Sequence, residues 1–185
     1  MTDGVVAIAM TLLVLPLVES SSEVDARHPF AYVGAHSGLL LSFVISFLVI
    51  HAFWTAHGSA VRRLHDSPVD VAALGPLTMA WLLVVVFLPF PTAVVGRDLT
   101  TSSASAYIGT MVVLSALTSA ITTAVERRLG GTNRIAWTWA TTAVFGICAL
   151  LSLVDAELGL FALLSLAALR VVEVRRRGRA PAAPG

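Results

Sequence analysis

Residues 8–15 place four side chains in a pattern that could form a constriction for ions. Ile8, Leu12 and Leu15 are spaced four and three residues apart, which puts them on one stripe of a helix, and Thr11 borders that stripe. If several copies of this first-helix stripe gathered around one axis, they would form hydrophobic rings with hydroxyl groups between them. Hydrophobic rings in a narrow pore exclude water, and hydroxyl groups replace part of an ion's hydration shell. Alternatively, the stripe simply faces lipid or a neighbouring helix, and periodicity alone leaves both interpretations open.

A second set of residues could form a polar network at one end of the helices. Trp54 and His57 lie three residues apart and therefore share a helix face. In the topology derived below, Asp3 lies on the same side of the membrane, where its carboxylate could accept hydrogen bonds from the indole and imidazole N–H groups. Alternatively, Trp54 is an aromatic anchor at the membrane interface and His57 is solvated.

The remaining ionisable residues carry no enzymatic or metal-binding pattern. His51 lies deeper in its apolar segment, where either a functional role or a neutral structural role is possible. No pair of histidines has the spacing of a metal site, and the single Cys148 excludes an intramolecular disulfide. The sequence has no nucleophile elbow, no phosphate-binding glycine loop and no basic patch with interleaved aromatics. We therefore expect no enzyme activity, no metal, no cofactor and no nucleic-acid partner.

Composition indicates which elements position these residues. Hydrophobic residues make up 57% of the chain and charged residues only 12%, and the mean hydropathy is +0.86, whereas soluble domains are about a quarter charged. A spanning helix needs about 20 mostly apolar residues. The sequence therefore predicts an all-α polytopic membrane protein with six transmembrane helices. They are expected at Gly4–Val18, Tyr32–Ala56, Val71–Leu88, Ala106–Ala124, Ile135–Val154 and Leu158–Val174.

The domain organisation follows from these spans. We expect one transmembrane domain over residues 1–177 and a flexible cytoplasmic tail, rich in Pro, Ala and Gly, over residues 178–185. Pro89 and Pro91 flank an aromatic residue directly after the third span. Because proline lacks an N–H and restricts the residue before it, this segment is predicted to stop the helix and continue as extended chain.

The positions of the arginines predict the orientation in the membrane. The chain has no lysine, and short connectors rich in Lys or Arg stay cytoplasmic. Only Arg27 and Arg97 fall in the odd-numbered connectors. With six spans, this asymmetry places both termini on the cytoplasmic side of a multi-pass cell-membrane protein. The arginines of the even-numbered connectors and the C-terminal end are Arg62, Arg63, Arg127, Arg128, Arg134, Arg170, Arg175, Arg176, Arg177 and Arg179.

With these segments assigned, the sequence resembles the transmembrane-protein-175 family of potassium-permeable channels, in its bacterial single-repeat form. The run from Thr2 to Leu15, TDGVVAIAMTLLVL, is similar to the family's first-helix signature, Phe-Ser-Asp-Gly/Ala followed by a hydrophobic run containing Thr-Leu-Leu-Val-Leu. Met1 and Thr2 stand where that signature has Phe and Ser. Further similarity lies in the second segment, from Ser42-Phe43 to Trp54-x-x-His57, and in the Leu-Pro-Phe-Pro-Thr run that follows the third.

The resemblance implies a homotetramer of six-helix subunits whose first helices line a central pore. The permeant ion would be K⁺, and the partners would be other copies of the chain, membrane lipid and monovalent cations. The family has no selectivity-filter loop of the common potassium-channel type, and none is visible in this sequence. The resemblance assigns the hydrophobic constriction to Ile8, Leu12 and Leu15, the hydroxyl layer to Thr11, and the inner polar network to Asp3, Trp54 and His57.

Two other functions are compatible with the residues. A small proton- or cation-coupled secondary transporter would use His51 and His57, although transporters favour broken helices with polar residues near the midplane, and few polar groups lie there in this sequence. A membrane-embedded scaffold without transport activity would be a stable monomer in detergent. The motifs favour the potassium-permeable channel.

Overall fold

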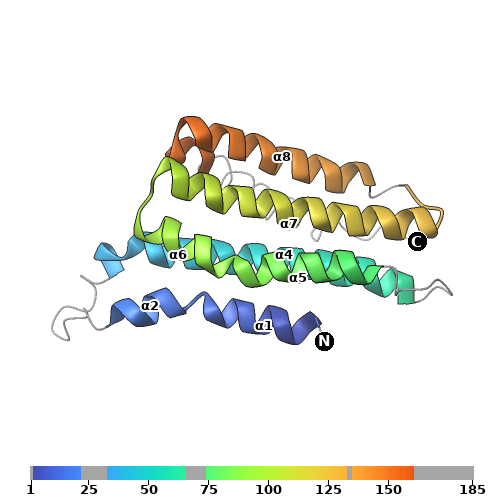
Figure 1. Cartoon of the computed structure of the whole chain (residues 1–185), viewed down its shortest axis with the longest axis horizontal. Helices are drawn as coiled ribbons and strands as arrows, with labels where there is room; N and C mark the ends of the chain where they lie inside the picture. The colour runs from blue at the N-terminus through green and yellow to red at the C-terminus, as the bar shows by residue number, and fades with distance from the viewer. Residues whose placement is uncertain (1, 22–32, 66–73, 133–134, 161–185) are drawn as a thin grey trace, which may run out of the picture.

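The structure, a computed structural model, describes residues 2–21, 33–65, 74–132 and 135–160. In these ranges the regular secondary structure is entirely helical, and the long helices run side by side as one elongated bundle (Figure 1). The helices are α1 (Thr2–Leu12), α2 (Leu15–Ser20), α4 (Ser37–His65), α5 (Gly75–Phe87), α6 (Pro89–Arg97), α7 (Thr101–Arg128) and α8 (Ile135–Val154).

Five stretches of the described chain are long and apolar enough to cross a membrane. The all-α class and the multi-pass character predicted from the sequence are therefore confirmed. The sixth predicted span, Leu158–Val174, lies outside the described residues except for its first turn, where residues 156–160 are helical. The predicted tail, 178–185, also lies outside them. The five stretches are Thr2–Ser20, Ser37–Arg63, Gly75–Arg97, Thr101–Arg128 and Ile135–Val154.

Helix α7 is the centre of the bundle, with buried side chains along its length from Ser103 to Glu126. It packs against α4, α5 and α6 on one side and against α8 on the other (Figure 1). It begins earlier than its predicted start at Ala106 because Thr100 and Ser103 form a capping box. The Ser103 N–H donates to Thr100 Oγ1 (3.1 Å) and the Thr100 N–H donates to Ser103 Oγ (2.9 Å). These polar residues lower the hydropathy of the segment, yet they stabilise the helix start.

The segment after the third predicted span is helical, so the prediction of an extended chain there is wrong. Helix α6 begins at Pro89, in the first turn of a helix, where a missing N–H removes no intrahelical bond. Thr92 reinforces the junction because both its N–H (3.2 Å) and its hydroxyl (2.8 Å) donate to the Leu88 carbonyl. Helices α5 and α6 therefore form a single span over Gly75–Arg97.

Hydroxyl groups and glycines hold the helices together where apolar side chains gain little from packing in lipid. Buried Ser46 on α4 is hydrogen-bonded to Thr92 on α6 (2.8 Å) and to the Tyr107 hydroxyl on α7 (2.9 Å). Helices α4 and α6 also approach closely at their glycines, since a Cβ added to Gly38 would lie 2.7 Å from the carbonyl oxygen of Gly96. The two helices are therefore in close backbone contact at this point.

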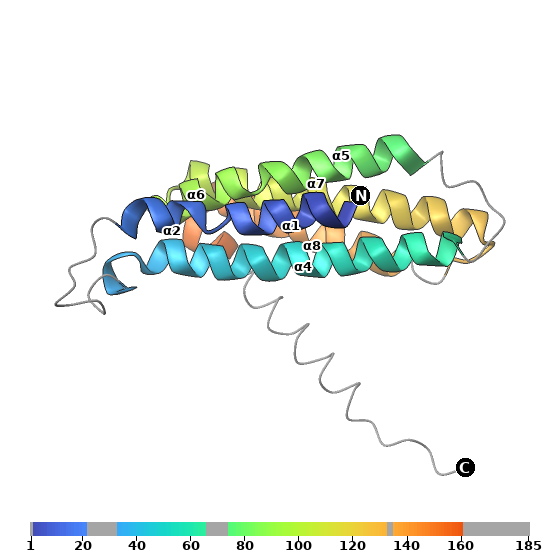
Figure 2. The ribbon, with the colours of Figure 1, turned by 90° about the horizontal axis from the view of Figure 1, so that it is seen from below.

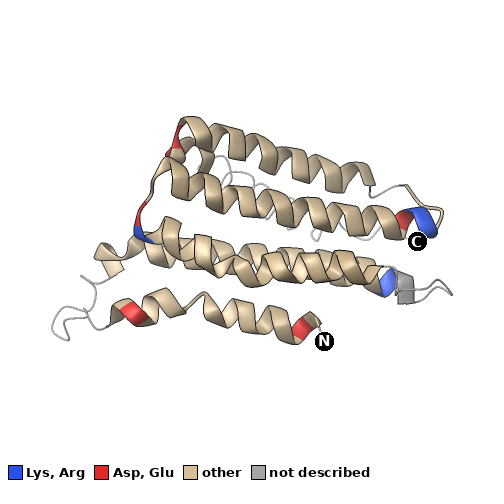
Figure 3. Cartoon of the chain, in the orientation of Figure 1, with Lys and Arg blue, Asp and Glu red and all other residues tan. Residues whose placement is uncertain are grey.

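Charged residues of the described chain lie at the two ends of the bundle, and the middle carries none (Figure 3). The end that holds Asp3 also holds the ion pair between Arg63 on α4 and Glu126 on α7. The opposite end holds Glu19 on α2 and Arg97 on α6, which form a second ion pair. We call these the Asp3 end and the Glu19 end. Such segregation is typical of helices that cross a bilayer.

Candidate functional site

The first span lies at the edge of the bundle, along the line between α4 and the α5–α6 span (Figure 2). Its outward face contains the whole first-helix stripe. Ile8 is 61% exposed, Leu15 49% and Leu12 41%, and Thr11 is exposed as well. The side chains that attach the span to the bundle are Val6, Ala9 and Leu13, each at most 2% exposed.

The span is interrupted between α1 and α2, at Leu13 and Val14. Pro16, in the first turn of α2, causes the interruption because it has no N–H and its ring clashes with the carbonyl four residues earlier. The N–H of Val14 donates to the Thr11 carbonyl (3.3 Å), which closes a tighter turn than an α-helix makes. The interruption falls between Leu12 and Leu15, within the first-helix stripe.

The orientation of the Thr11 hydroxyl is fixed by its own helix. Thr11 Oγ1 donates to the carbonyl of Ile8 at 2.7 Å. A hydroxyl has one hydrogen to donate and two lone pairs that accept. Because the hydrogen is used inside the helix, the oxygen on this exposed face is free to act as an acceptor for a water molecule or a cation.

At the Asp3 end, the structure joins two of the three residues assigned to the inner polar network. The Trp54 indole N–H donates to Asp3 Oδ1 at 2.9 Å, linking α4 to the first turn of α1. His57 is 4% exposed and stacks on Trp81 of α5, with ring centroids 4.4 Å apart and an interplanar angle of 15°. Its Nδ1 has no hydrogen-bond partner among the described residues. The hydrogen bond from His57 to Asp3 that the sequence suggested is not among the contacts.

The sequence analysis missed Trp81, the partner of His57. Trp81 is fully buried and its indole N–H donates to Thr118 Oγ1 on α7 at 3.0 Å. No spacing rule connects Trp81 with His57, because they lie on different helices. Only the presence of an aromatic residue within the third predicted span could have suggested the stack.

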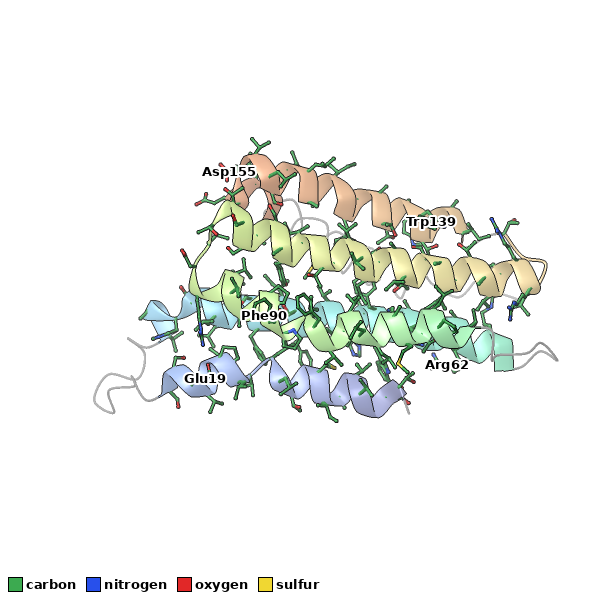
Figure 4. All side chains as sticks on the ribbon, viewed as in Figure 1. Glu19, Arg62, Phe90, Trp139 and Asp155 are labelled. Atoms are coloured by element: carbon green, nitrogen blue, oxygen red, sulfur yellow. The ribbon has the colours of Figure 1, made fainter. Side chains whose placement is uncertain are left out.

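A cavity of about 450 Å³ opens at the Asp3 end between α1, α4 and α5. Its polar lining includes Thr2, Asp3, His57, Arg62 and Thr78. Figure 4 shows Arg62 at this end and Glu19 at the opposite one. A carboxylate, a guanidinium, an imidazole and two hydroxyls can together hold water, so the Asp3 end of the first span borders a space whose lining suits water.

At the Glu19 end, Arg97 Nη2 donates to Glu19 Oε2 at 2.7 Å. Both side chains are more than half exposed, so the pair contributes little to stability, but it links the end of α2 to the end of α6. The first span is therefore attached at both ends, through Asp3–Trp54 and through Glu19–Arg97. The sequence analysis did not foresee the second attachment, because Glu19 and Arg97 lie in separate polar connectors.

His51, the residue on which a coupled transporter would depend, lies exposed on α4. Its ring is 5.8 Å from that of Trp54 in a tilted arrangement. His51 lines neither the cavity at the Asp3 end nor a second cavity, of about 400 Å³, at the Glu19 end. Neither of these two cavities therefore gives His51 a substrate pocket.

Comparison with known proteins gives two matches. Residues 1–89 match the family described as the endosomal/lysosomal potassium channel TMEM175. Among solved structures, a lysosomal potassium-selective channel TMEM175 homolog from Chamaesiphon minutus is similar at 24% identity, over 97% of this chain and 95% of that chain, with a TM-score of 0.75. No curated protein sequence matches the chain. The resemblance inferred from the motifs is confirmed, and both matches are ion channels rather than enzymes.

Proposed function

We propose that this chain, whose first 89 residues match the TMEM175 potassium-channel family, forms a potassium-permeable channel as a homotetramer of six-helix subunits. The observation that carries the proposal is the exposed face of the first span. Its opposite face is packed at Val6, Ala9 and Leu13, while its own subunit leaves the first-helix stripe uncovered. A six-helix bundle has almost no lumen, so a conduction path fits best between copies related by a closed rotation axis.

In such a tetramer the first-helix stripe would surround the axis. Ile8, Leu12 and Leu15 would form hydrophobic rings that exclude water when narrow. Thr11 would present its oxygen to the axis, because its hydrogen is already bonded to the Ile8 carbonyl. Four such oxygens offer a cation a partial replacement for its hydration shell, and they repel anions.

The inner polar network of Asp3, Trp54 and His57 would fix the pore helix at its inner end. The Asp3–Trp54 hydrogen bond supplies the direct link, and the stacking of His57 on Trp81 stiffens the surface to which that link is attached. Asp3 also lies in the first turn of α1, where a negative charge interacts favourably with the helix dipole.

The proposed orientation places the Asp3 end in the cytoplasm and both termini on that side of the cell membrane. Arg62 lines the cavity that Asp3 lines, and Arg63 pairs with Glu126 beside Arg127 and Arg128 in the last turn of α7, whereas Arg97 pairs with Glu19. Figure 3 shows blue Lys and Arg segments at both ends of the bundle. Arginine-rich short connectors remain on the cytoplasmic side during insertion.

The test is potassium flux into liposomes that contain the purified protein. Ile8→Asn should raise the flux, because a polar ring hydrates a constriction that a branched apolar ring keeps dry. The matched control is Ile147→Asn on α8, because Ile147 is 57% exposed and Ile8 61%, yet Ile147 lies outside the proposed pore. An absence of flux from both wild type and Ile8→Asn would refute the channel. Equal flux from Ile8→Asn and Ile147→Asn would show that Ile8 faces lipid.

A further inference from the structure

The break in the first span frees a backbone oxygen. The carbonyl of Leu12 would normally accept the N–H four residues later, but that residue is Pro16. None of the backbone hydrogen bonds across the break in the described chain reaches the Leu12 carbonyl. Within the described chain, the N–H of Val14 donates to Thr11, and those of Leu17 and Val18 both donate to Val14.

The freed oxygen lies on the face that bears the first-helix stripe. A helical carbonyl points along the axis toward residue i+4, so it occupies the surface line between residues i and i+4. For Leu12 that line runs to Pro16, and both Leu12 and the adjacent Leu15 are exposed. From this geometry we infer that the carbonyl opens to the side of the span that bears Leu12 and Leu15, away from the packed Leu13.

An unpaired carbonyl distinguishes a pore-facing surface from a lipid-facing one. Hydrocarbon offers no hydrogen-bond donor, so broken helix geometry at membrane depth is tolerated where it is buried in protein or lines a water-filled space. The Leu12 carbonyl is also at the C-terminal end of α1, where the helix dipole adds partial negative charge. Unwound carbonyls at half-helix ends are a recurring ligand for monovalent cations in membrane proteins.

We propose that the Leu12 carbonyls of the assembled subunits form a second cation-binding oxygen layer, adjacent to the Thr11 hydroxyl layer on the side away from Asp3. The inference rests on the proposed function, because one carbonyl per subunit makes a site only when copies surround an axis. Its ligand is a partly dehydrated monovalent cation, and the residue that creates the site is Pro16. Two successive oxygen layers allow the ion to pass between them without full rehydration.

The test distinguishes the effect of the missing N–H at residue 16 from the effect of the proline ring. Pro16→Ala restores the N–H, which pairs the Leu12 carbonyl and removes it from the pore. We expect the K⁺ to Na⁺ permeability ratio, measured on reconstituted channels in planar bilayers, to fall roughly two- to tenfold, the range that one net hydrogen bond is worth. Replacing Pro16 by the α-hydroxy analogue of alanine creates a backbone ester that lacks both the ring and the N–H. That variant should keep the wild-type ratio.

The outcomes distinguish the oxygen layer from the channel itself. An unchanged ratio in Pro16→Ala, or an equal fall in the ester variant, overturns the Leu12 layer while wild-type flux still supports the channel. Absence of flux in the wild type overturns both. Pro89→Ala is the matched control, since it replaces a proline at the start of α6, away from the first span, and should leave the ratio unchanged.

Discussion

The indole N–H of Trp54 donates to a carboxylate oxygen of Asp3 across 2.9 Å, and this contact links the pore-helix candidate α1 to the long helix α4. The two residues are far apart in the sequence, but both lie at the same end of the bundle. The bond is charge-assisted, and such bonds are stronger than those between neutral groups. It therefore holds the N-terminal end of α1 against α4.

Removing the indole donor should loosen α1. Trp54→Phe keeps an aromatic ring but leaves Asp3 without its partner, and we expect a loss of about 1–2 kcal/mol, at the lower end for a bond to a charged group because Asp3 is exposed. Thermal unfolding in detergent measures the change. Asp3→Asn, which retains an acceptor oxygen, should cost less than Trp54→Phe; the reverse order would mean that the charge of Asp3 and not the bond positions the helix.

Replacing Arg63 by alanine should lower the free energy of unfolding, whereas the same change at Arg62 should have little effect. Glu126 on α7 is 2% exposed and its carboxylate is paired with Arg63. Arg63→Ala leaves that buried charge unpaired, at a cost of about 1–3 kcal/mol, because the 42% exposure of Arg63 lets water replace part of the interaction. Arg62→Ala, on the cavity wall, should change the unfolding free energy by no more than about 0.5 kcal/mol. Equal effects of the two substitutions would contradict the importance of the buried pair.

Replacing glycine by alanine should lower the stability at Gly96, where α4 and α6 approach closely, but not at Gly109 on α7, where there is open space. A Cβ on Gly96 would lie 2.4 Å from Ser42 Oγ and 3.0 Å from Leu39 Cα, so Gly96→Ala should destabilise the protein by about 1–3 kcal/mol. Gly109 on α7 has nothing within 4 Å of its added Cβ. Gly109→Ala should therefore be neutral or stabilising by up to about 1 kcal/mol. Thermal unfolding of both variants is the measurement, and tolerance of Gly96→Ala would rule out the tight contact.

The Thr11 oxygen should affect cation selectivity and not folding. Thr11→Val removes the oxygen at nearly constant shape, and we expect the K⁺ to Na⁺ permeability ratio to fall, whereas Thr11→Ser should preserve it. Thr110→Val on α7 is the control, because Thr110 is a partly accessible helix-surface residue whose hydroxyl likewise donates to a carbonyl of its own helix. A ratio that changes equally in Thr11→Val and Thr110→Val would remove Thr11 from the conduction path.

The sequence predicted the five spans of the described chain well because the mean hydropathy of a long segment reflects the apolar thickness of the bilayer that it must cross. The prediction was wrong at Pro89, where a helix begins, and at Thr100, which starts α7 before the predicted span. At both positions the local role of the residue differs from its average preference for non-helical or polar segments. Proline ends a helix from its interior but starts one at the first turn, and a polar threonine caps a helix that hydropathy would exclude. These effects depend on where the preceding helix ends, which the sequence does not state.

For the candidate site, sequence periodicity could place Ile8, Thr11, Leu12 and Leu15 together because they belong to one continuous helix. It could not find the stack of His57 on Trp81 or the Glu19–Arg97 pair, since each joins two helices whose relative rotation depends on packing. The break that Pro16 introduces could be predicted only in part. The residue is plain in the sequence, but its consequence for the Leu12 carbonyl depends on which face of the span is packed.

The attachment of the first span at both ends restricts which part of it can move. Asp3 is fixed to α4 and Glu19 to α6, and α4 and α6 are themselves in backbone contact at Gly38 and Gly96. The first span is thus held to the same pair of helices at both ends, and its intrahelical hydrogen bonding is interrupted between them, at Leu13 and Val14. In the proposed tetramer, bending at this interruption would change the width of the pore at mid-depth more than at its two ends.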